Sequence, residues 1–162
     1  MRGNGDGWVR ADDGRSFWGV YGAAGLLLRH RPDTGPSRFL LAQRAAWVHR
    51  GHGQWAIPGG ARDRHESAWD AALREFDEEI GRLPDGLVRV GDFVDDALPG
   101  RWSYTTCCAD VAEAPAYHRT LSVENDAADW FTVADLARVP LFGPVAVALP
   151  HLLALFDEPT PR

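Results

Sequence analysis

Residues 60–82 read GARDRHESAWDAALREFDEEIGR, and the second half of this stretch has the periodicity of an amphipathic helix. Apolar residues recur there every four positions, which places them on one face of a helix. They are Ala68, Ala72, Phe76 and Ile80. Ser67 stands before the first of them and Asp70 follows three residues later, an arrangement that caps a helix N-terminus. Gly81 is a residue that commonly ends a helix. The sequence therefore predicts a helix from Ser67 to Ile80.

The polar face of this predicted helix carries three carboxylates. Glu75, Glu78 and Glu79 stand at positions i, i+3 and i+4, which adjacent turns bring to one side. Like charges this close repel each other, and a divalent cation bound between them would remove the repulsion; Mg²⁺ and Mn²⁺ prefer such oxygen ligands. A solvated acidic helix end, with Arg82 paired to Glu78, would give the same pattern. The three glutamates alone leave both interpretations open.

The residues before the helix favour the metal site. The run Trp-Ala-Ile-Pro-Gly-Gly at 55–60 leads into Glu66, and residues 74–81 read REFDEEIG. In identity and spacing, residues 60–82 resemble the Nudix box, which is a glycine, an early glutamate and then Arg-Glu-apolar-x-Glu-Glu-x-Gly-apolar. Only the last position departs, because Arg82 stands where an apolar residue is typical, and Leu83 follows it. The resemblance implies a MutT-like member of the Nudix hydrolase family.

The resemblance also implies a role for each residue of the motif. The metal ligands would be Glu75, Glu79, Glu78 and the backbone carbonyl of Gly60, and the cofactor Mg²⁺, with Mn²⁺ as an alternative. Glu66 and Arg74 would form an ion pair that fixes the loop onto the helix. Metal sites need such supporting contacts to orient their ligands.

Hydrolysis of a diphosphate linkage also needs a proton acceptor and a partner for the phosphates. A bound cation lowers the pKa of water, and a carboxylate then accepts the proton. The candidates for this base are Glu75, Glu78, Glu124 and Asp129, of which the last two lie in the loop before Trp130 and could equally be solvated charges. Arg44 ends a predicted strand and would bind substrate phosphates through its guanidinium fork, or be a surface arginine.

The rest of the chain predicts strands interleaved with helices. Apolar and alternating runs predict strands at 20–28, 38–43, 87–94, 102–111 and 130–133. A helical turn is expected at 134–139 and a helix at 144–156, whereas 1–16 should be flexible or an edge strand and 50–64 irregular. This order indicates the α/β class, and the resemblance implies a Nudix-type α/β/α sandwich with a mixed β-sheet between helices. We expect a single domain over 1–162.

Two adjacent cysteines and several aromatic residues are further features of the sequence that bear on the site. Cys107 and Cys108 fall on one predicted strand, where successive side chains point to opposite faces, so we expect no disulfide between them. Aromatic side chains can stack on a nucleobase. The candidates for stacking are Trp47, Trp55, Trp102 and Tyr104, although Trp55 is expected to pack under the Gly-rich loop.

Composition excludes some classes of partner. The 162-residue chain has a net charge of −6, whereas a general nucleic-acid binder needs a basic face. Its longest apolar stretch, 142–156, is too short for a membrane span, and residues 1–15 lack the apolar core of a signal peptide. We therefore expect a cytoplasmic protein with no nucleic-acid or membrane partner. Nudix proteins are often homodimers, and no interface signal is evident in this sequence.

Three functions remain open at this level. By elimination we favour a MutT-like pyrophosphohydrolase that cleaves a diphosphate linkage in a nucleoside triphosphate or another nucleoside diphosphate derivative. An ADP-ribose or coenzyme A pyrophosphatase is the alternative, because the distinguishing motifs of these subfamilies match only in part. A non-catalytic nucleotide-binding Nudix module is the third, and it would predict a damaged box.

Overall fold

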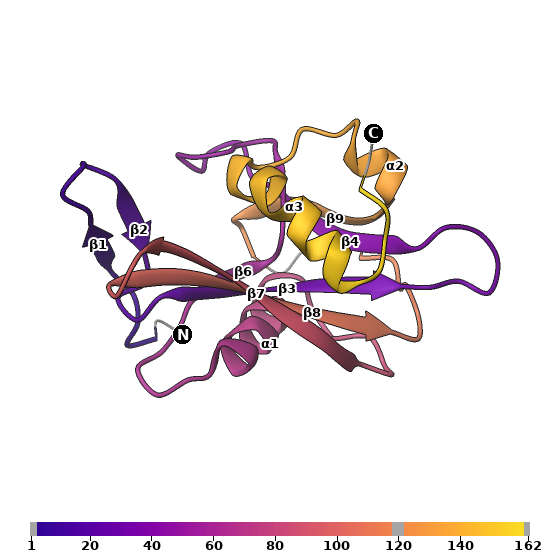
Figure 1. The fold of residues 1–162 in the computed structure, drawn as a ribbon, viewed down its shortest axis with the longest axis horizontal. Coiled ribbons are helices and arrows are strands. Elements are labelled where there is room, and N and C mark those ends of the chain that lie inside the picture. The colour runs from indigo at the N-terminus through magenta and orange to yellow at the C-terminus, as the bar shows by residue number, and fades with distance from the viewer. Residues whose placement is uncertain (1–2, 118–121, 161–162) are drawn as a thin grey trace.

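The computed structural model describes residues 3–117 and 122–160 of the chain. Figure 1 shows the arrangement of its helices and strands. In chain order they are β1 (Trp8–Arg10), β2 (Ser16–Trp18), β3 (Ala23–His30), β4 (Arg38–Arg44), β5 (Trp55–Ala56), β6 (Gly59–Ala61), α1 (Ala68–Glu79), β7 (Val88–Leu98), β8 (Trp102–Val111), β9 (Asn125–Thr132), α2 (Val133–Leu136) and α3 (Gly143–Leu155).

In the described part of the chain, seven strands form one mixed sheet. Its main path runs β5-β4-β3-β8-β7, with β6 paired to β3 and β9 paired to β4. The two central strands β3 and β8 are parallel, whereas the other pairs are antiparallel. The predicted strands at 20–28 and 38–43 correspond to β3 and β4, which pair as an antiparallel hairpin.

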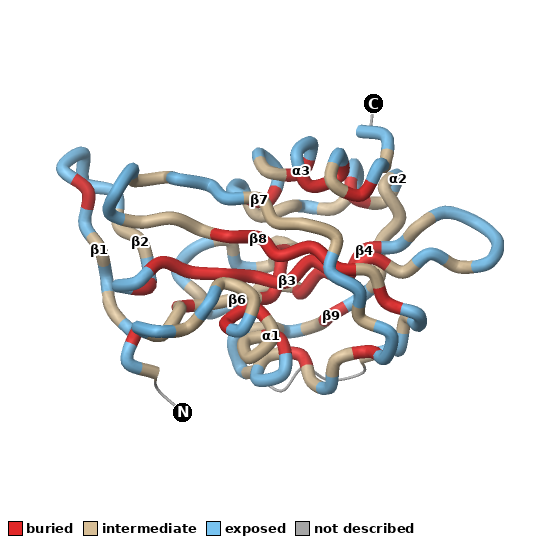
Figure 2. The backbone as a smooth tube through the Cα atoms, turned by 60° about the horizontal axis from the view of Figure 1, so that its bottom comes forward, coloured by how far each residue is buried: buried red, intermediate tan, exposed pale blue. Residues whose placement is uncertain are grey.

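Two helices cover opposite faces of this sheet. Figure 1 shows α1 below the sheet and α3 above it, and Figure 2 shows that the buried backbone follows the central strands between them. The core under α1 includes Leu26, Leu40 and Phe76, and the core under α3 includes Leu27 and Leu41. The consecutive residues of β3 and β4 thus alternate between the two layers, as the pleat of a strand requires. The expected α/β/α sandwich with a mixed sheet is confirmed.

Helix α1 begins and ends where its sequence predicts. The Ser67 hydroxyl accepts a hydrogen bond of 3.0 Å from the backbone N–H of Asp70 and donates one of 2.6 Å to the Asp70 carboxylate. At the other end Ile80 is the C-cap, and Gly81 takes a φ of +130°. Ala72 and Phe76 are fully buried, so the predicted phase of the helix is correct. The phase of the helix determines which of its side chains pack on the sheet and which, like the three glutamates, lie away from the core.

Four segments contain more strand structure than the sequence predicts. Residues 8–18 form the β1–β2 hairpin, and part of 50–64 forms β5 and β6, which pair with β4 and β3. Strand β7 extends beyond the predicted end at residue 94 to Leu98 and includes acidic residues, because it lies at the sheet edge where charges stay in water. Strand β9 starts at Asn125, earlier than its weak local β-propensity predicts, because β4 pairs with it along its length.

The two cysteines lie in different layers. Cys107 packs in the core under α1 and Cys108 in the core under α3, and both are free thiols. Burial raises the pKa of each thiol to about 12, so both are neutral. The expected absence of a disulfide between them agrees with this geometry. Within residues 3–117 and 122–160, none of the helices is long and apolar enough to cross a membrane.

Candidate active site

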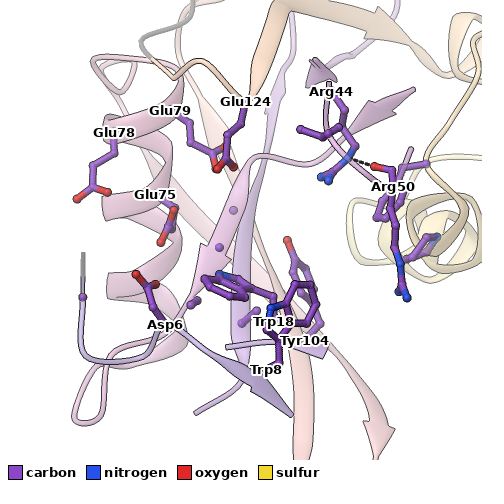
Figure 3. Close-up of a pocket in the computed structure, with 18 of the residues that line it drawn as sticks. Asp6, Trp8, Trp18, Arg44, Arg50, Glu75, Glu78, Glu79, Tyr104 and Glu124 are labelled. Atoms are coloured by element: carbon purple, nitrogen blue, oxygen red, sulfur yellow. Dashed lines mark hydrogen bonds between the residues drawn. The ribbon is translucent and has the colours of Figure 1, made fainter. Parts of the chain in front are cut away.

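An open cavity of about 1070 Å³ lies beside the polar face of α1. Figure 3 shows side chains from several distant segments that face into it. They come from the β1–β2 hairpin, the end of β4, strand β6, helix α1, strand β8 and the loop before β9. The cavity therefore exists only in the folded chain, although the predicted motif supplies one of its walls.

Arg74 joins α1 to the loop before it. Its Nε donates a hydrogen bond of 2.9 Å to Oε1 of Glu66, and its Nη2 donates one of 2.9 Å to Oε2 of the same carboxylate. Nη2 also donates a bond of 2.9 Å to the carbonyl of Ala61. The hydrogen bond from Arg74 is the main cause that lowers the pKa of Glu66 below its usual value. The structure thus contains the Glu66–Arg74 ion pair that the motif implies, and this pair places β6 against α1.

Glu75 lies between Arg74 and the glycine pair of β6. Its Oε1 accepts a hydrogen bond of 2.7 Å from Nη1 of Arg74. A Cβ atom added to Gly60 would lie 2.5 Å from Oε2 of Glu75, so a glycine leaves the space that this carboxylate occupies. Burial is the largest influence on Glu75 and raises its pKa despite the nearby guanidinium. Glu75 therefore faces the cavity in a tightly bounded position.

Glu79 is the most strongly perturbed carboxyl group of the site. Burial, together with the negative charges of Glu75 and Glu124, raises its pKa to about 8, although hydrogen bonds from Asn125 and the backbone of Gly59 act in the opposite direction. The bond from Nδ2 of Asn125 measures 3.2 Å. Figure 3 shows the carboxylates of Glu79 and Glu124 pointing toward each other. Among the described residues Glu79 forms no salt bridge, so no protein cation offsets the cost of ionising its carboxyl group.

Glu78 differs from its two neighbours on the helix. Its side chain is 46% exposed and its carboxylate lies 3.6 Å from Nη1 of Arg74. In Figure 3 it points along the outer side of α1. The predicted grouping at i, i+3 and i+4 is present, but Glu75 and Glu79 face the cavity more directly than Glu78 does. Arg82 pairs with Asp85, and the Arg82–Glu78 pair of the alternative interpretation, a solvated helix end, is absent among the described ion pairs.

The donor set suits a hard divalent cation. Within the described residues, no three His, Cys, Asp or Glu side chains are already arranged as a metal site. Glu75 is paired with Arg74, and Glu78 lines the edge of the cavity but is 46% exposed. The α1 side of the cavity nevertheless offers carboxylate oxygens, and the partly buried Glu79 lies near two other carboxylates. Buried charge of one sign is costly unless it is neutralised by protons or a cation, so the residues fit Mg²⁺ or Mn²⁺.

The raised pKa of Glu79 predicts how the metal-free protein responds to pH. The folded state binds the proton up to about pH 8, whereas the unfolded state releases it near 4.5, so folding is disfavoured progressively as pH rises between these values. With a chelator present, we expect the free energy of unfolding of wild type to fall relative to Glu79→Gln from pH 5 to 8. Urea denaturation at several pH values measures this difference. Two parallel pH curves would contradict the expectation.

Arg44 supplies positive charge on the opposite side of the cavity. Its Nε donates a hydrogen bond of 2.8 Å to the carbonyl of Arg50, and its guanidinium lies 4.8 Å from the ring centre of Phe142. A register shift between Gln43 and Arg44 turns the end of β4 at this point. Figure 3 shows Arg44 across the cavity from the acidic residues of α1, with Arg50 on the same side as Arg44. The cavity is thus polarised, with carboxylates on one wall and guanidinium groups on the other.

The two acidic candidates near β9 lie in different places. Glu124 lines the cavity, and its carbonyl accepts a hydrogen bond of 2.8 Å from the N–H of Ala45. Asp129 pairs with Leu41, whose side chain belongs to the core under α3, and it is exposed. Because paired residues of adjacent strands share a face, Asp129 lies on the side of the sheet away from α1. The structure does not bring Asp129 to the site.

Sequence reasoning overlooked the residues that the β1–β2 hairpin contributes. Asp6, Trp8 and Trp18 line the cavity although they stand far from the motif in the sequence. Alternating residues on both sides of the Asp13-Gly14 turn are a hairpin signal that could have indicated this element. The contact between Asn125 and Glu79 had no comparable signal, because it depends on where β9 pairs.

Comparison with known proteins places this site in a family context. The NUDIX domain family matches residues 22–153 of the chain, which includes α1 and the loop before it. A solved structure titled as a Nudix hydrolase from M. smegmatis, RenU, is 37% identical to the chain, with a TM-score of 0.82, and the match covers 94% of this chain and 96% of that one. The similarity therefore extends through almost the whole of both chains.

Curated relatives are similar over shorter portions of their length. A protein named "Putative 8-oxo-dGTP diphosphatase 3" in two strains of Mycobacterium tuberculosis is 48% identical over 118 residues, which are 70% of this chain and 54% of the relative. A nucleoside triphosphate pyrophosphatase/Nudix hydrolase fusion protein of Bifidobacterium longum is 37% identical over 95% of this chain and 32% of its own length. The chain thus spans about half of the first two relatives and a third of the last.

Proposed function

The chain belongs to the NUDIX family, and from this premise we propose that it is a Mg²⁺-dependent hydrolase of a diphosphate linkage in a nucleoside triphosphate. One observation carries the proposal: Glu75, Glu79 and Glu124 gather negative charge at a cavity whose opposite wall holds Arg44. A cation bound to the carboxylates would complement the phosphates from one side, while the arginine would complement them from the other.

The motif residues would hold the cation. We propose that Glu75 and Glu79 are the main ligands, with Glu78 and the backbone carbonyl of Gly60 completing the set. When bound, Mg²⁺ neutralises phosphate charge and lowers the pKa of a coordinated water. The contacts from Arg74 to Glu66 and Glu75 would orient the ligands, as the partners of metal-binding side chains generally do.

Glu124 is the best placed of the four candidate bases. It lines the cavity next to Glu79, whereas Asp129 lies on the other face of the sheet. Glu75 is engaged by Arg74, and Glu78 points along the outside of α1. The bond from Ala45 to the Glu124 carbonyl fixes the loop that carries it. We propose that the Glu124 carboxylate accepts the proton of the attacking water.

The substrate class follows from the phosphate-facing wall and from the relatives. Arg44 and Arg50 both line the cavity and would bind the phosphate chain through guanidinium forks. The names of the two curated relatives refer to 8-oxo-dGTP and to nucleoside triphosphates, and neither refers to ADP-ribose or coenzyme A. These names favour a nucleoside triphosphate.

We also propose that residues 1–162 act as one domain, because α1 and α3 pack on the same sheet.

Hydrolysis assays with a panel of nucleotides test the proposed function. We expect release of pyrophosphate from one or more deoxynucleoside triphosphates, including the 8-oxo-guanine form, in the presence of Mg²⁺ and its loss with a chelator. ADP-ribose and coenzyme A serve as comparison substrates. Mg²⁺ plus nucleotide should also raise the melting temperature, because ligands that bind only the folded state stabilise it. Absence of hydrolysis across the panel, with no change in melting temperature, would contradict the proposal.

A further inference from the structure

The β1–β2 hairpin presents two exposed indole rings to the cavity that contains the acidic residues. Trp8 and Trp18 are opposite each other in the hairpin register, with ring centroids 5.1 Å apart and planes at 70°. They are 59% and 42% exposed, and both line the cavity. Resting on the function proposed above, we propose that Trp8 and Trp18 form the binding site for the nucleobase of the substrate.

The pleat of the hairpin separates its anchoring residue from the two tryptophans. Phe17 lies on the other face of β2 and stacks on Trp102, with ring centroids 4.6 Å apart and planes at 25°. Nε1 of Trp102 also donates a hydrogen bond of 3.2 Å to the carbonyl of Trp18. One face of the hairpin therefore packs on β8, and the face with Trp8 and Trp18 remains available to a ligand.

Hydrogen bonds connect this hairpin to the acidic helix. The N–H of Gly5 donates a bond of 3.0 Å to Oδ1 of Asp63, and the N–H of Asp63 donates one of 3.0 Å to Oε2 of Glu66. Glu66 in turn pairs with Arg74 on α1. A side chain on Gly5 would collide with the carbonyl of Arg62, so the two segments approach each other closely. These contacts hold the tryptophans at a defined position relative to Glu75.

The geometry of the tryptophan pair suits a flat aromatic ring. Because the indoles are nearly perpendicular, they form a corner in which a ligand ring can stack on one indole and meet the edge of the other. Every nucleobase has a face that can stack in this way. Figure 3 shows the two indoles on the same side of the cavity as Tyr104, away from Arg44 and Arg50. With its base at this corner, a nucleotide could extend its phosphates toward Arg44 and the acidic residues of α1.

Kinetics with two substrates that differ only in the base test this inference. The KM is measured in Mg²⁺ for wild type, Trp8→Ala and Trp18→Ala. One substrate is a nucleoside triphosphate that wild type hydrolyses, and the other is base-free ribose 5-triphosphate. Loss of stacking should raise the KM for the nucleotide about 5- to 100-fold and leave the KM for the base-free substrate unchanged. Trp8→Phe and Trp18→Phe should restore much of the lost affinity. Tyr21→Ala, which removes an aromatic ring that is 42% exposed and outside the cavity, is the matched control and should change neither KM.

The outcomes separate this inference from the proposed function. If wild type hydrolyses both substrates and the alanine variants keep the wild-type KM for the nucleotide, the inference is overturned while the proposed function stands. An equal rise in KM for both substrates would also overturn the inference, since the base-free compound has no ring to stack. If wild type hydrolyses neither substrate, the proposed function fails and the inference fails with it.

Discussion

Glu79→Gln should reduce turnover by at least about 100-fold while the fold is retained. Removal of a residue that only supports a metal ligand typically costs 10- to 100-fold, and we propose that Glu79 binds the cation directly. An amide keeps the size of the side chain but loses the negative charge that attracts Mg²⁺. Steady-state kinetics with the nucleotide identified in the hydrolysis panel, measured over a range of Mg²⁺ concentrations, give the change in kcat and in the Mg²⁺ requirement.

Glu79→Gln should raise the free energy of unfolding of the metal-free protein, although it lowers turnover. Burial and neighbouring carboxylates disfavour the charged form of Glu79, so at neutral pH folding must bind a proton at this group, and a neutral amide removes that cost in the metal-free protein. Asp77→Asn is the matched control, because it makes the same chemical change at an exposed position of the same helix. We expect Asp77→Asn to retain wild-type turnover. Near wild-type turnover in Glu79→Gln would remove Glu79 from the proposed metal ligands.

Phe76→Ala should lower the free energy of unfolding by about 3–5 kcal/mol, because it leaves a cavity in the core. Phe76 is fully buried on α1, packs in the layer that contains Leu26 and Leu40, and meets the ring of Tyr117 edge to face at 6.0 Å. The surrounding strands belong to a paired sheet and cannot collapse far into the space. Urea denaturation monitored by circular dichroism measures the loss.

A matched truncation at the surface should have little effect. Val147 lies on α3 and is 77% exposed, so Val147→Ala should change the free energy of unfolding by no more than about 0.5 kcal/mol. The contrast between the two variants separates loss of core packing from a general effect of shortening an apolar side chain. A loss below about 1 kcal/mol in Phe76→Ala would mean that α1 does not pack as described.

Local pattern was sufficient to predict α1 and the order of the residues on it. The spacing of apolar residues sets the phase of a helix within a few turns, and the cap at Ser67 and the glycine at position 81 set its ends. The grouping of Glu75, Glu78 and Glu79 follows from the same phase. All of these contacts lie within one element or the loop next to it, so the sequence alone contains the information.

Contacts between distant segments decided the rest of the site. The sheet register places Glu124 at the cavity and Asp129, which lies in β9, on the opposite face, although the sequence predicts both in the loop before Trp130. The hairpin carrying Trp8 and Trp18 is held at the cavity because Asp63 accepts a hydrogen bond from the N–H of Gly5, just before the hairpin. The pKa of Glu79 likewise depends on burial and on charges brought together by folding.

The sequence by itself determined the acidic helix and its ends, because helix phase is a local property, whereas the mixed sheet was implied by the resemblance to the Nudix family. Only the tertiary structure decided which acidic loop residue joins the helix, which aromatic rings face the cavity and how strongly Glu79 holds its proton. Strand register and burial depend on residues far apart in the chain, and no local pattern specifies the distance between them.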